Sequence, residues 1–187
     1  VMKGYFNKPE ATAAVIDGAG WFATGDVGKI DADGFLYITD RKKDLIVTGG
    51  GKNIAPQPIE NLLKTNLFVE QAIIIGDRRP YLVLLIVPAI EALEHWASQN
   101  DIEWSSSGEL VSNELVLAHV ERETLGMLSG LASFETPKKI ALLSEELTIE
   151  NGMLTPTLKV KRSSVEEGFS GVIEELYAGT AADGPSS

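Results

Sequence analysis

The sequence predicts an α+β fold, and two observations carry this prediction. From about Asp44 onward, short apolar β-forming runs alternate with helical patterns in the order β-α-β-β-α-α-β. Before Asp40, the sequence is aromatic, punctuated by glycine and typical of a β-hairpin. We therefore expect a small domain with a mainly antiparallel sheet flanked by helices. A β-hairpin segment precedes it and needs another partner to bury both of its faces.

The first forty residues are expected to hold one short helix and one hairpin. The helix is predicted around Pro9–Ile16, because Asp17-Gly18 provides a stop signal. Residues 27–30 and 35–38 flank Asp31–Gly34, a turn with glycine where a positive φ is needed. This acidic turn lacks the third acidic ligand and the distal glutamate of an EF-hand, so we expect no calcium site there.

A charged, glycine-rich link follows the hairpin. Thr39–Asn53 reads TDRKKDLIVTGGGKN, which combines charges of both signs, a short β-forming segment and three consecutive glycines. Such a link suits a hinge between two rigid bodies, because glycine reaches positive φ at no steric cost. An ordinary solvated loop with a β-turn fits the same pattern. A Walker A phosphate loop does not, because Asn53 follows Lys52 where that motif requires Ser or Thr.

Hydrophobic periodicity predicts the remaining elements. These are a helix from Pro56 with Ile59, Leu62 and Leu63 facing the core, strands at Val69–Ile75, Tyr81–Val87 and Lys138–Leu143, a helix at Ala89–Gln99, a long helix at Glu109–Leu131 broken near Gly126 or Gly130, a hairpin around Asn151-Gly152, and a last helix from about Val160 to Ala178. Residues 179–187 are small and polar, so we expect a disordered tail.

Composition narrows the function classes. The chain has 187 residues, 44% of them hydrophobic, and a formal net charge of -11, which disfavours bulk nucleic-acid binding but permits a compact phosphate-bearing ligand. It has no cysteine, which excludes disulfides and thiol chemistry and suggests a reducing compartment. His95 and His119 are isolated within helical patterns, so a histidine metal site or triad is not expected. The longest apolar run, Leu82–Val87, is too short to span a membrane.

One lysine stands out for its position. Lys159 lies in the run Thr155–Arg162, TPTLKVKR, between a predicted hairpin and a predicted helix. An ammonium group placed there is able to present a point charge to a phosphate or carboxylate. The alternative is a solvated lysine in a basic first turn.

Four motifs occur in a fixed order along the chain. They are Thr24-Gly25-Asp26, Asp40–Asp44 (DRKKD), Gly49–Asn53 followed by Pro56 and Glu60, and Pro156–Arg162. Together they resemble the late core motifs of the adenylate-forming superfamily, the AMP-forming acyl-CoA synthetases. The wording from Asp40 to Asn53 is most similar to that of long-chain fatty acid–CoA ligases, and VMKGYFNKPEA at the start resembles the segment that precedes these motifs.

The resemblance implies a division into domains. Residues 1–42 would be the incomplete C-terminal end of the large N-terminal adenylation domain, and residues 43–178 the whole mobile C-terminal domain. The chain opens on Val1-Met2-Lys3 without an initiator methionine, so we expect a fragment. Its missing N-terminal domain would carry the phosphate loop, the acyl tunnel and the glutamate motif that binds Mg²⁺, leaving no metal ligand in these residues.

The resemblance also implies roles for individual residues. Asp26 would accept hydrogen bonds from the ribose hydroxyls of ATP or AMP, and Arg41 would be a second ribose or phosphate contact. Their alternatives are a turn aspartate and a surface charge. Lys43 falls at the hinge position and, in some relatives, also reaches phosphate.

Two further positions concern the chemistry itself. Lys159 matches the lysine that stabilises charge while the carboxylate attacks the α-phosphate. Gly49, Gly50, Gly51 and Lys52 belong to the loop that lines the path of CoA. Most of the superfamily has glycine immediately before the catalytic lysine, whereas this chain has Leu158, which leaves Lys161 as a rival.

The implied function is that of an ATP-dependent fatty acid–CoA ligase. Carboxylate and ATP give acyl-AMP and pyrophosphate, and CoA then displaces AMP to give acyl-CoA. Its partners would be ATP or AMP, Mg²⁺, CoA, a fatty acid and the missing N-terminal domain, without which the fragment is expected to be inactive. We expect a cytoplasmic location, with peripheral membrane contact left open. The alternatives are another acid-activating enzyme, such as an aryl or short-chain ligase or a peptide-synthetase adenylation domain, and a non-catalytic binding module.

Overall fold

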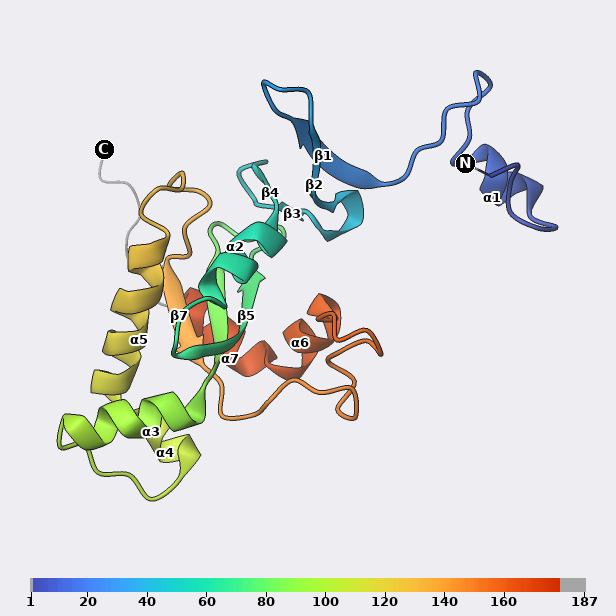
Figure 1. Cartoon of the computed structure of the whole chain (residues 1–187). Helices are drawn as coiled ribbons and strands as arrows, with labels where there is room; N and C mark the ends of the chain where they lie inside the picture. Colours follow the sequence, from blue (N-terminus) through green and yellow to red (C-terminus); the bar gives the residue numbers. More distant parts are fainter. Residues whose placement is uncertain (1, 179–187) are drawn as a thin grey trace. The chain divides into compact units, whose positions relative to one another are not determined.

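The computed structural model describes residues 2–178, which form two compact units with their boundary between Leu45 and Ile46 (Figure 1). The expected tail, residues 179–187, lies outside the described residues. The first unit contains α1 (Pro9–Ala13), β1 (Asp26–Ile30), β2 (Leu36–Arg41) and a 3₁₀ turn (Lys42–Asp44). The second contains β3 (Ile46–Val47), β4 (Asn53–Ile54), α2 (Pro56–Leu63), β5 (Val69–Ile75), β6 (Val83–Pro88), α3 (Ile90–Gln99), α4 (Ser107–Ser112), α5 (Glu114–Met127), β7 (Lys139–Leu142), α6 (Arg162–Gly168) and α7 (Ser170–Ala178).

The first unit confirms the predicted hairpin. β1 and β2 pair antiparallel, from Ile30 opposite Leu36 to Asp26 opposite Arg41. The connecting turn is held by Asp31, whose Oδ1 accepts hydrogen bonds from the N–H groups of Asp33 at 3.0 Å and Phe35 at 2.9 Å. The Phe35 bond is the main cause that lowers the pKa of Asp31. Large apolar side chains of this hairpin are exposed: Ile30, Phe35, Leu36, Tyr37 and Ile38.

A three-stranded sheet is the centre of the second unit. Its order is β5-β6-β7, with β5 antiparallel to β6 and β6 parallel to β7. Successive side chains of a strand point to opposite faces, so the sheet has a core on each side. On one face, Ile74, Leu84 and Ile86 pack with buried side chains of α2, α3, α4 and α5. On the other, Ile73 and Leu85 pack with α6 and α7, so helices cover both faces (Figure 1).

Two predicted helices are each broken in two. The helix predicted at Glu109–Leu131 begins earlier, and its break lies at Asn113, between α4 and α5, not near Gly126 or Gly130. α5 continues through Gly126 and ends at Met127. The Asn113 Oδ1 atom accepts hydrogen bonds from the N–H groups of Leu115 at 2.9 Å and Val116 at 3.3 Å, so it caps a new helix instead of continuing the first. The final predicted helix is likewise interrupted at Phe169, between α6 and α7.

Two smaller predictions were wrong. Leu62 is 40% exposed and does not face the core, although Ile59 and Leu63 are buried as expected. The turn at Asn151-Gly152 forms, with the Thr148 N–H donating to Asn151 Oδ1 at 3.0 Å, but no strands flank it. Asparagine satisfies the backbone of this turn locally, so a ladder is not required. No helix of residues 2–178 is long and apolar enough to cross a bilayer.

Candidate functional site

The first unit brings Asp26 and Arg41 together. They are cross-strand partners at the open end of the β1–β2 hairpin, and the Arg41 Nε atom lies 2.8 Å from Asp26 Oδ1. The Asp26 side chain is 27% exposed and the Arg41 side chain 56%, so both remain accessible to a ligand. A carboxylate has about four lone-pair sites, so this ion pair leaves acceptor capacity for hydroxyl donors. The ion pair therefore places a carboxylate that is able to accept hydrogen bonds from hydroxyl groups beside a guanidinium that is able to bind an anion.

Lys43 lies in the 3₁₀ turn that ends the first unit. This turn is tied to the hairpin by the neighbouring Lys42, whose N–H donates to the Gly25 carbonyl at 2.8 Å. The Lys43 side chain is exposed, and its Cα lies three residues before Ile46, where the second unit begins. Along the chain, this residue therefore lies next to the boundary between the two units.

Gly49–Lys52 form the turn of a small antiparallel hairpin between β3 and β4. The Gly51 N–H donates to the Thr48 carbonyl at 2.8 Å, and Gly51 has a φ of +73°, a conformation that favours glycine. The Lys52 N–H donates to Thr48 Oγ1 at 3.2 Å. The Lys52 ammonium lies 5.4 Å from the ring centroid of Phe134, within the range of a cation–π contact.

The turn that follows β5 supports this glycine hairpin. The Gly49 N–H donates to the Arg79 carbonyl at 2.7 Å, and the Arg78 N–H donates to the Val47 carbonyl at 2.8 Å. A Cβ atom added at Gly49 would lie 3.3 Å from the Arg79 oxygen, so the close approach of the two backbones suits glycine. The position of the glycine turn therefore depends on residues 76–80.

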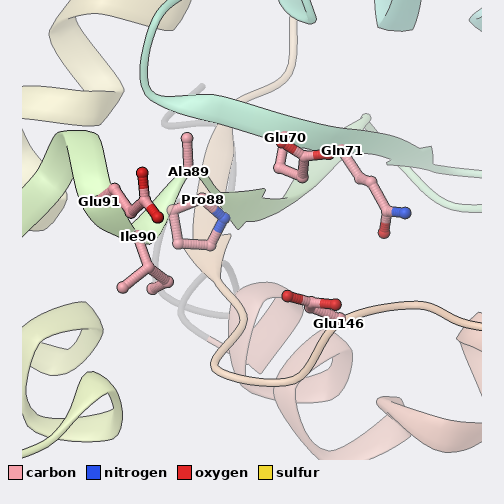
Figure 2. Close-up of a pocket in the computed structure, with 7 residues that line it drawn as sticks. All are labelled: Glu70, Gln71, Pro88, Ala89, Ile90, Glu91 and Glu146. Carbon is pink, nitrogen blue, oxygen red and sulfur yellow. The ribbon is translucent and has the colours of Figure 1, made fainter.

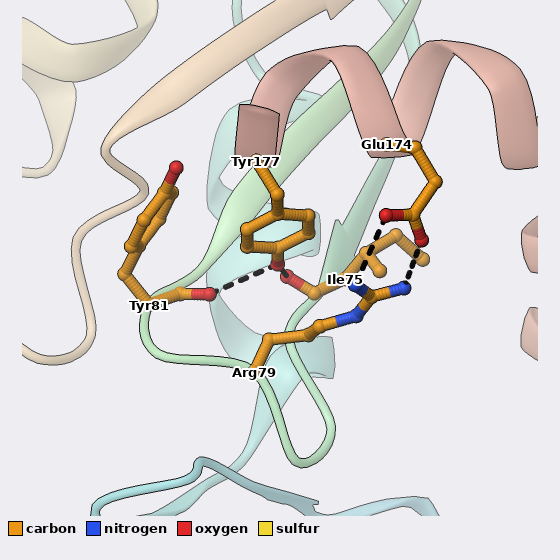
Figure 3. Close-up of polar contacts among 5 residues, drawn as sticks. All are labelled: Ile75, Arg79, Tyr81, Glu174 and Tyr177. Atoms are coloured by element: carbon orange, nitrogen blue, oxygen red, sulfur yellow. Dashed lines mark hydrogen bonds and ion pairs between the residues drawn. The ribbon is translucent and has the colours of Figure 1, made fainter. Parts of the chain in front are cut away.

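A cluster on α7 fixes that supporting turn in place (Figure 3). The Arg79 guanidinium pairs with Glu174 at 2.5 Å and lies 4.8 Å over the Tyr177 ring. The Tyr177 hydroxyl donates to the Tyr81 carbonyl at 3.0 Å, and burial raises the pKa of this hydroxyl. The hydrogen bond from Arg79 lowers the pKa of Glu174. Arg79 therefore connects α7, which its guanidinium contacts, to the glycine turn, which its carbonyl contacts.

Lys159 ends a tight turn that begins at Thr155. The Thr155 N–H donates to the Lys159 carbonyl at 2.8 Å, and the Lys159 N–H donates to Thr155 Oγ1 at 3.0 Å. The backbone of Lys159 is therefore held on both sides, whereas its side chain is exposed. No carboxylate of the described residues forms an ion pair with its ammonium. A fixed backbone with an unpaired, accessible cation suits delivery of positive charge to a ligand.

Leu158 precedes this lysine in an unusual conformation. Its φ is +58°, in the left-handed region that glycine adopts freely and leucine does not. Its side chain is 69% exposed, so little packing compensates for the backbone strain. The positive φ explains why glycine suits this position, although this chain has leucine there.

The rival, Lys161, has a different structural role. It is the N-cap of α6, and its carbonyl accepts hydrogen bonds from Ser164 at 2.9 Å and Val165 at 3.1 Å. Its own N–H donates to the Met153 carbonyl at 2.8 Å. A cation next to the positive end of a helix is disfavoured by the helix dipole, whereas Lys159 lies before that end, in the turn. This difference favours Lys159 as the residue that meets a ligand.

A separate hollow of about 420 Å³ lies on the second unit (Figure 2). Three carboxylates line it, from Glu70, Glu91 and Glu146, together with Pro88 and Ile90. Carboxylates repel phosphate groups, so this hollow does not suit a nucleotide, and it contains none of the predicted site residues. Within the described part of the chain, no group of three His, Cys, Asp or Glu side chains could hold a metal ion.

Sequence reasoning assigned no role to a buried ion pair that joins α2 to α6. Arg162 Nη2 contacts Glu60 Oε1, and the two side chains are 20% and 12% exposed. Both residues belong to motifs that the resemblance identified, but their separation of 102 residues hides the contact. Membership of these two motifs was the only signal for either residue that the sequence offered.

Comparison with known proteins agrees with this architecture. The family described as AMP-binding enzyme C-terminal domain matches residues 43–127. Long-chain-fatty-acid–CoA ligase FadD15 of Mycobacterium tuberculosis is 38% identical over 178 residues, which cover 95% of this chain and 30% of that protein. Long-chain-fatty-acid–CoA ligase 6 of Homo sapiens is 39% identical over 180 residues, covering 95% of this chain and 26% of that protein.

A solved structure extends the comparison to the fold. The A domain of carboxylic acid reductase from Segniliparus rugosus, in complex with AMP and a co-purified carboxylic acid, has a TM-score of 0.77 and 29% sequence identity, covering 97% of this chain and 27% of that chain. The chain therefore spans less than a third of the length of these relatives. The α+β fold expected from the sequence is confirmed, and residues 43–127 of the chain match the family of AMP-binding enzyme C-terminal domains.

Proposed function

We propose that this chain is the C-terminal part of an ATP-dependent fatty acid–CoA ligase of the long-chain type. The enzyme would convert a fatty acid and ATP to acyl-AMP and pyrophosphate, and then transfer the acyl group to CoA with release of AMP. Identity of 38–39% to long-chain ligases over 95% of the chain supports this substrate class. The structural observation that carries the proposal is the Thr155–Lys159 turn, which holds an exposed, unpaired ammonium on a fixed backbone.

In this proposal, Asp26 and Arg41 bind the nucleotide. The Asp26 carboxylate accepts hydrogen bonds from the ribose hydroxyls, and the 2.8 Å contact with Arg41 orients it. Arg41 adds a second contact to ribose or phosphate, for which the guanidinium is suited by its planar set of donors. Both residues would contribute mainly to nucleotide affinity and to alignment of the α-phosphate.

Lys159 would serve the first half-reaction. A carboxylate oxygen of the fatty acid attacks the α-phosphorus, the bond to the pyrophosphate oxygen breaks, and pyrophosphate leaves. Negative charge concentrates on the phosphoryl oxygens in the transition state, where a positioned ammonium is most effective if water is excluded. The locked backbone of Lys159 limits the reorganisation needed at that moment.

Gly49–Lys52 would serve the second half-reaction. The CoA thiolate attacks the acyl carbonyl carbon, and AMP leaves as the carbon–oxygen bond breaks. A turn of small residues lets the pantetheine chain approach the backbone closely. Lys43 lies beside the boundary of the two units along the chain and would be the hinge residue. Rotation at this hinge would bring the Thr155–Lys159 turn to the substrates in the first half-reaction and the Gly49–Lys52 turn in the second.

The proposal places the remaining machinery outside these residues. Residues 1–42 would complete a large N-terminal domain, and residues 43–178 would form the mobile C-terminal domain. The acyl pocket and the Mg²⁺ ligands would lie in that N-terminal domain. We therefore expect the 187-residue chain alone to show no fatty-acid-dependent turnover of ATP. We also propose a cytoplasmic location.

Another acid-activating enzyme is the second candidate, since the A domain of a carboxylic acid reductase shares the fold with a TM-score of 0.77. Two assays on the full-length protein separate the candidates: fatty-acid-dependent ATP–pyrophosphate exchange, and acyl-CoA formation with CoA present. Exchange together with acyl-CoA formation from long-chain acids supports the ligase. Exchange without acyl-CoA supports a different acyl acceptor, and exchange only with aryl or short-chain acids supports a different acid. Absence of exchange with every acid would refute an adenylate-forming activity.

A further inference from the structure

Glu60 and Arg162 connect the segments that follow the Gly49–Lys52 turn and the Thr155–Lys159 turn, which are proposed to act in different half-reactions. Glu60 lies on α2, the helix that follows the Gly49–Lys52 turn, and Arg162 is the first residue of α6, which follows the Thr155–Lys159 turn. Their side chains form an ion pair and are only 12% and 20% exposed, respectively. A pair this buried is held in one geometry, because both charges must stay compensated.

Both side chains also bind the backbone of β5 at Ile74. Glu60 Oε1 accepts a hydrogen bond from the Ile74 N–H at 2.9 Å, and Arg162 Nε donates to the Ile74 carbonyl at 2.9 Å. β5 is an edge strand, so the backbone groups on its outer side need partners from outside the sheet. The arginine fork contacts the strand and the glutamate together, which a lysine cannot do in the same way.

The ion pair lies close to Lys159 along the chain. Only Val160 and Lys161 separate Lys159 from Arg162, and both are restrained: Val160 forms a bridge with Leu154, and the Lys161 N–H donates to Met153. Lys159 has no side-chain partner among the described ion pairs, so its location is set by its backbone. Thr155 holds that backbone on one side, and the anchored start of α6 holds it on the other.

We propose that Arg162 and Glu60 are positioning residues for Lys159, and that they fix its turn to β5 and α2 so that the ammonium reaches the α-phosphate. This inference rests on the proposed role of Lys159 in adenylation. The competing explanation is that the ion pair only stabilises the fold. The two explanations predict different adenylation rates for a variant that lacks the ion pair but has regained its stability.

The test uses the full-length ligase with Arg162→Met, the double variant Glu60→Gln/Arg162→Met, Arg162→Lys and, as a control, Arg122→Met. Arg122 is a surface arginine whose side chain is 70% exposed. Three quantities are measured for each: the urea midpoint, the single-turnover rate of acyl-AMP formation, and the rate of acyl-CoA formation from supplied acyl-AMP. The ratio of the two rates is the decisive readout, because partial unfolding lowers both rates together.

We expect Arg162→Met to be strongly destabilised, because it leaves the Glu60 carboxylate buried without its cation. The double variant removes that charge, while the amide oxygen introduced by Glu60→Gln still accepts the Ile74 N–H, so its urea midpoint should recover most of the loss. Its adenylation rate should nevertheless stay about 10- to 100-fold low relative to thioester formation, since a displacement near 1 Å has an effect of this size. Arg162→Lys should give an intermediate ratio, and Arg122→Met the wild-type ratio.

A double variant with both a restored midpoint and a wild-type ratio would overturn the proposal and leave the pair a purely structural role. A wild-type ratio in Arg162→Lys would likewise overturn it, since charge alone would then suffice. Lys159→Ala in the same assay identifies the other kind of failure: if adenylation survives it, the proposed role of Lys159 is wrong. Hydrogen exchange provides a readout without catalysis, with the amides of Leu158 and Lys159 expected to exchange faster in the double variant of the 187-residue chain.

Discussion

The strained leucine next to Lys159 allows a quantitative test of the local geometry. Leu158 has a φ of +58° and is 69% exposed, and a left-handed conformation costs a non-glycine residue about 1–2 kcal/mol. Leu158→Gly removes that strain. It also loses the burial of the remaining third of the side chain, about 0.5–1 kcal/mol, and gains unfolded-chain entropy worth about 0.5–1 kcal/mol. The gain and the losses are similar, so the free energy of unfolding should change little.

Leu67 provides a matched control for this substitution. It lies in a turn, is 74% exposed and is absent from the positive-φ residues of the described chain. Leu67→Gly carries the same losses without relief of strain, so it should lower the free energy of unfolding by about 1–2 kcal/mol. Urea unfolding of the 187-residue chain, followed by far-UV circular dichroism, measures both variants. Equal destabilisation by the two substitutions would refute the argument from strain at Leu158.

Three further predictions concern the stability of the second unit. Burial lowers the pKa of His119, whose ring centroid lies 4.0 Å from that of Trp96, so the unfolded state binds a proton more readily than the folded state. The contribution of His119 to stability should therefore be complete above about pH 6.5 and fall below it. In urea titrations at about pH 7.5 and 5.5, His119→Phe should remove this pH dependence, whereas His95→Gln, at an exposed site, should keep it. Tyr177→Phe removes the hydroxyl that lies 3.0 Å from the Tyr81 carbonyl oxygen and 3.4 Å from the Ile75 carbonyl oxygen. The loss of this hydrogen bonding should cost about 1 kcal/mol in urea unfolding, and an unchanged free energy of unfolding would contradict it. Asn113→Ala removes the cap of α5 and should cost about 1 kcal/mol, whereas Asn113→Ser should cost little; equal losses in thermal unfolding would argue against capping.

Much of the fold is predictable because local patterns and tertiary burial agree. Apart from Glu70 and Gln71, the run Val69–Ile75 is apolar and mostly β-branched, and it forms β5 with the predicted bounds. The hairpin turn at Asp31–Gly34 forms because aspartate and glycine satisfy its backbone locally. Agreement fails at Asn113, where apolar residues continue on both sides and hide a helix cap that restarts the helix. Hydrophobic periodicity predicts which face of a helix is buried. It does not reveal a break when the residues before and after the break bury the same face.

The candidate site was less predictable because its geometry depends on contacts between distant residues. The motifs identify Asp26, Arg41 and Lys159, and the hairpin pattern accounts for the pairing of the first two. The ion pair between Glu60 and Arg162 spans 102 residues, so no local pattern announces it. The left-handed conformation before Lys159 is also hidden, since leucine is not a residue that predicts positive φ.

The central claim is that Lys159 acts in adenylation and not in thioester formation. The direct measurement separates the two proposed half-reactions in the full-length protein and compares wild type, Lys159→Ala and Lys161→Ala. The account predicts that Lys159→Ala lowers acyl-AMP formation by about 100- to 1,000-fold, the usual effect of removing one transition-state charge contact, while acyl-CoA formation from supplied acyl-AMP stays near wild type. Lys161→Ala should leave both rates near wild type. Unchanged acyl-AMP formation in Lys159→Ala, or its loss in Lys161→Ala instead, would contradict the account.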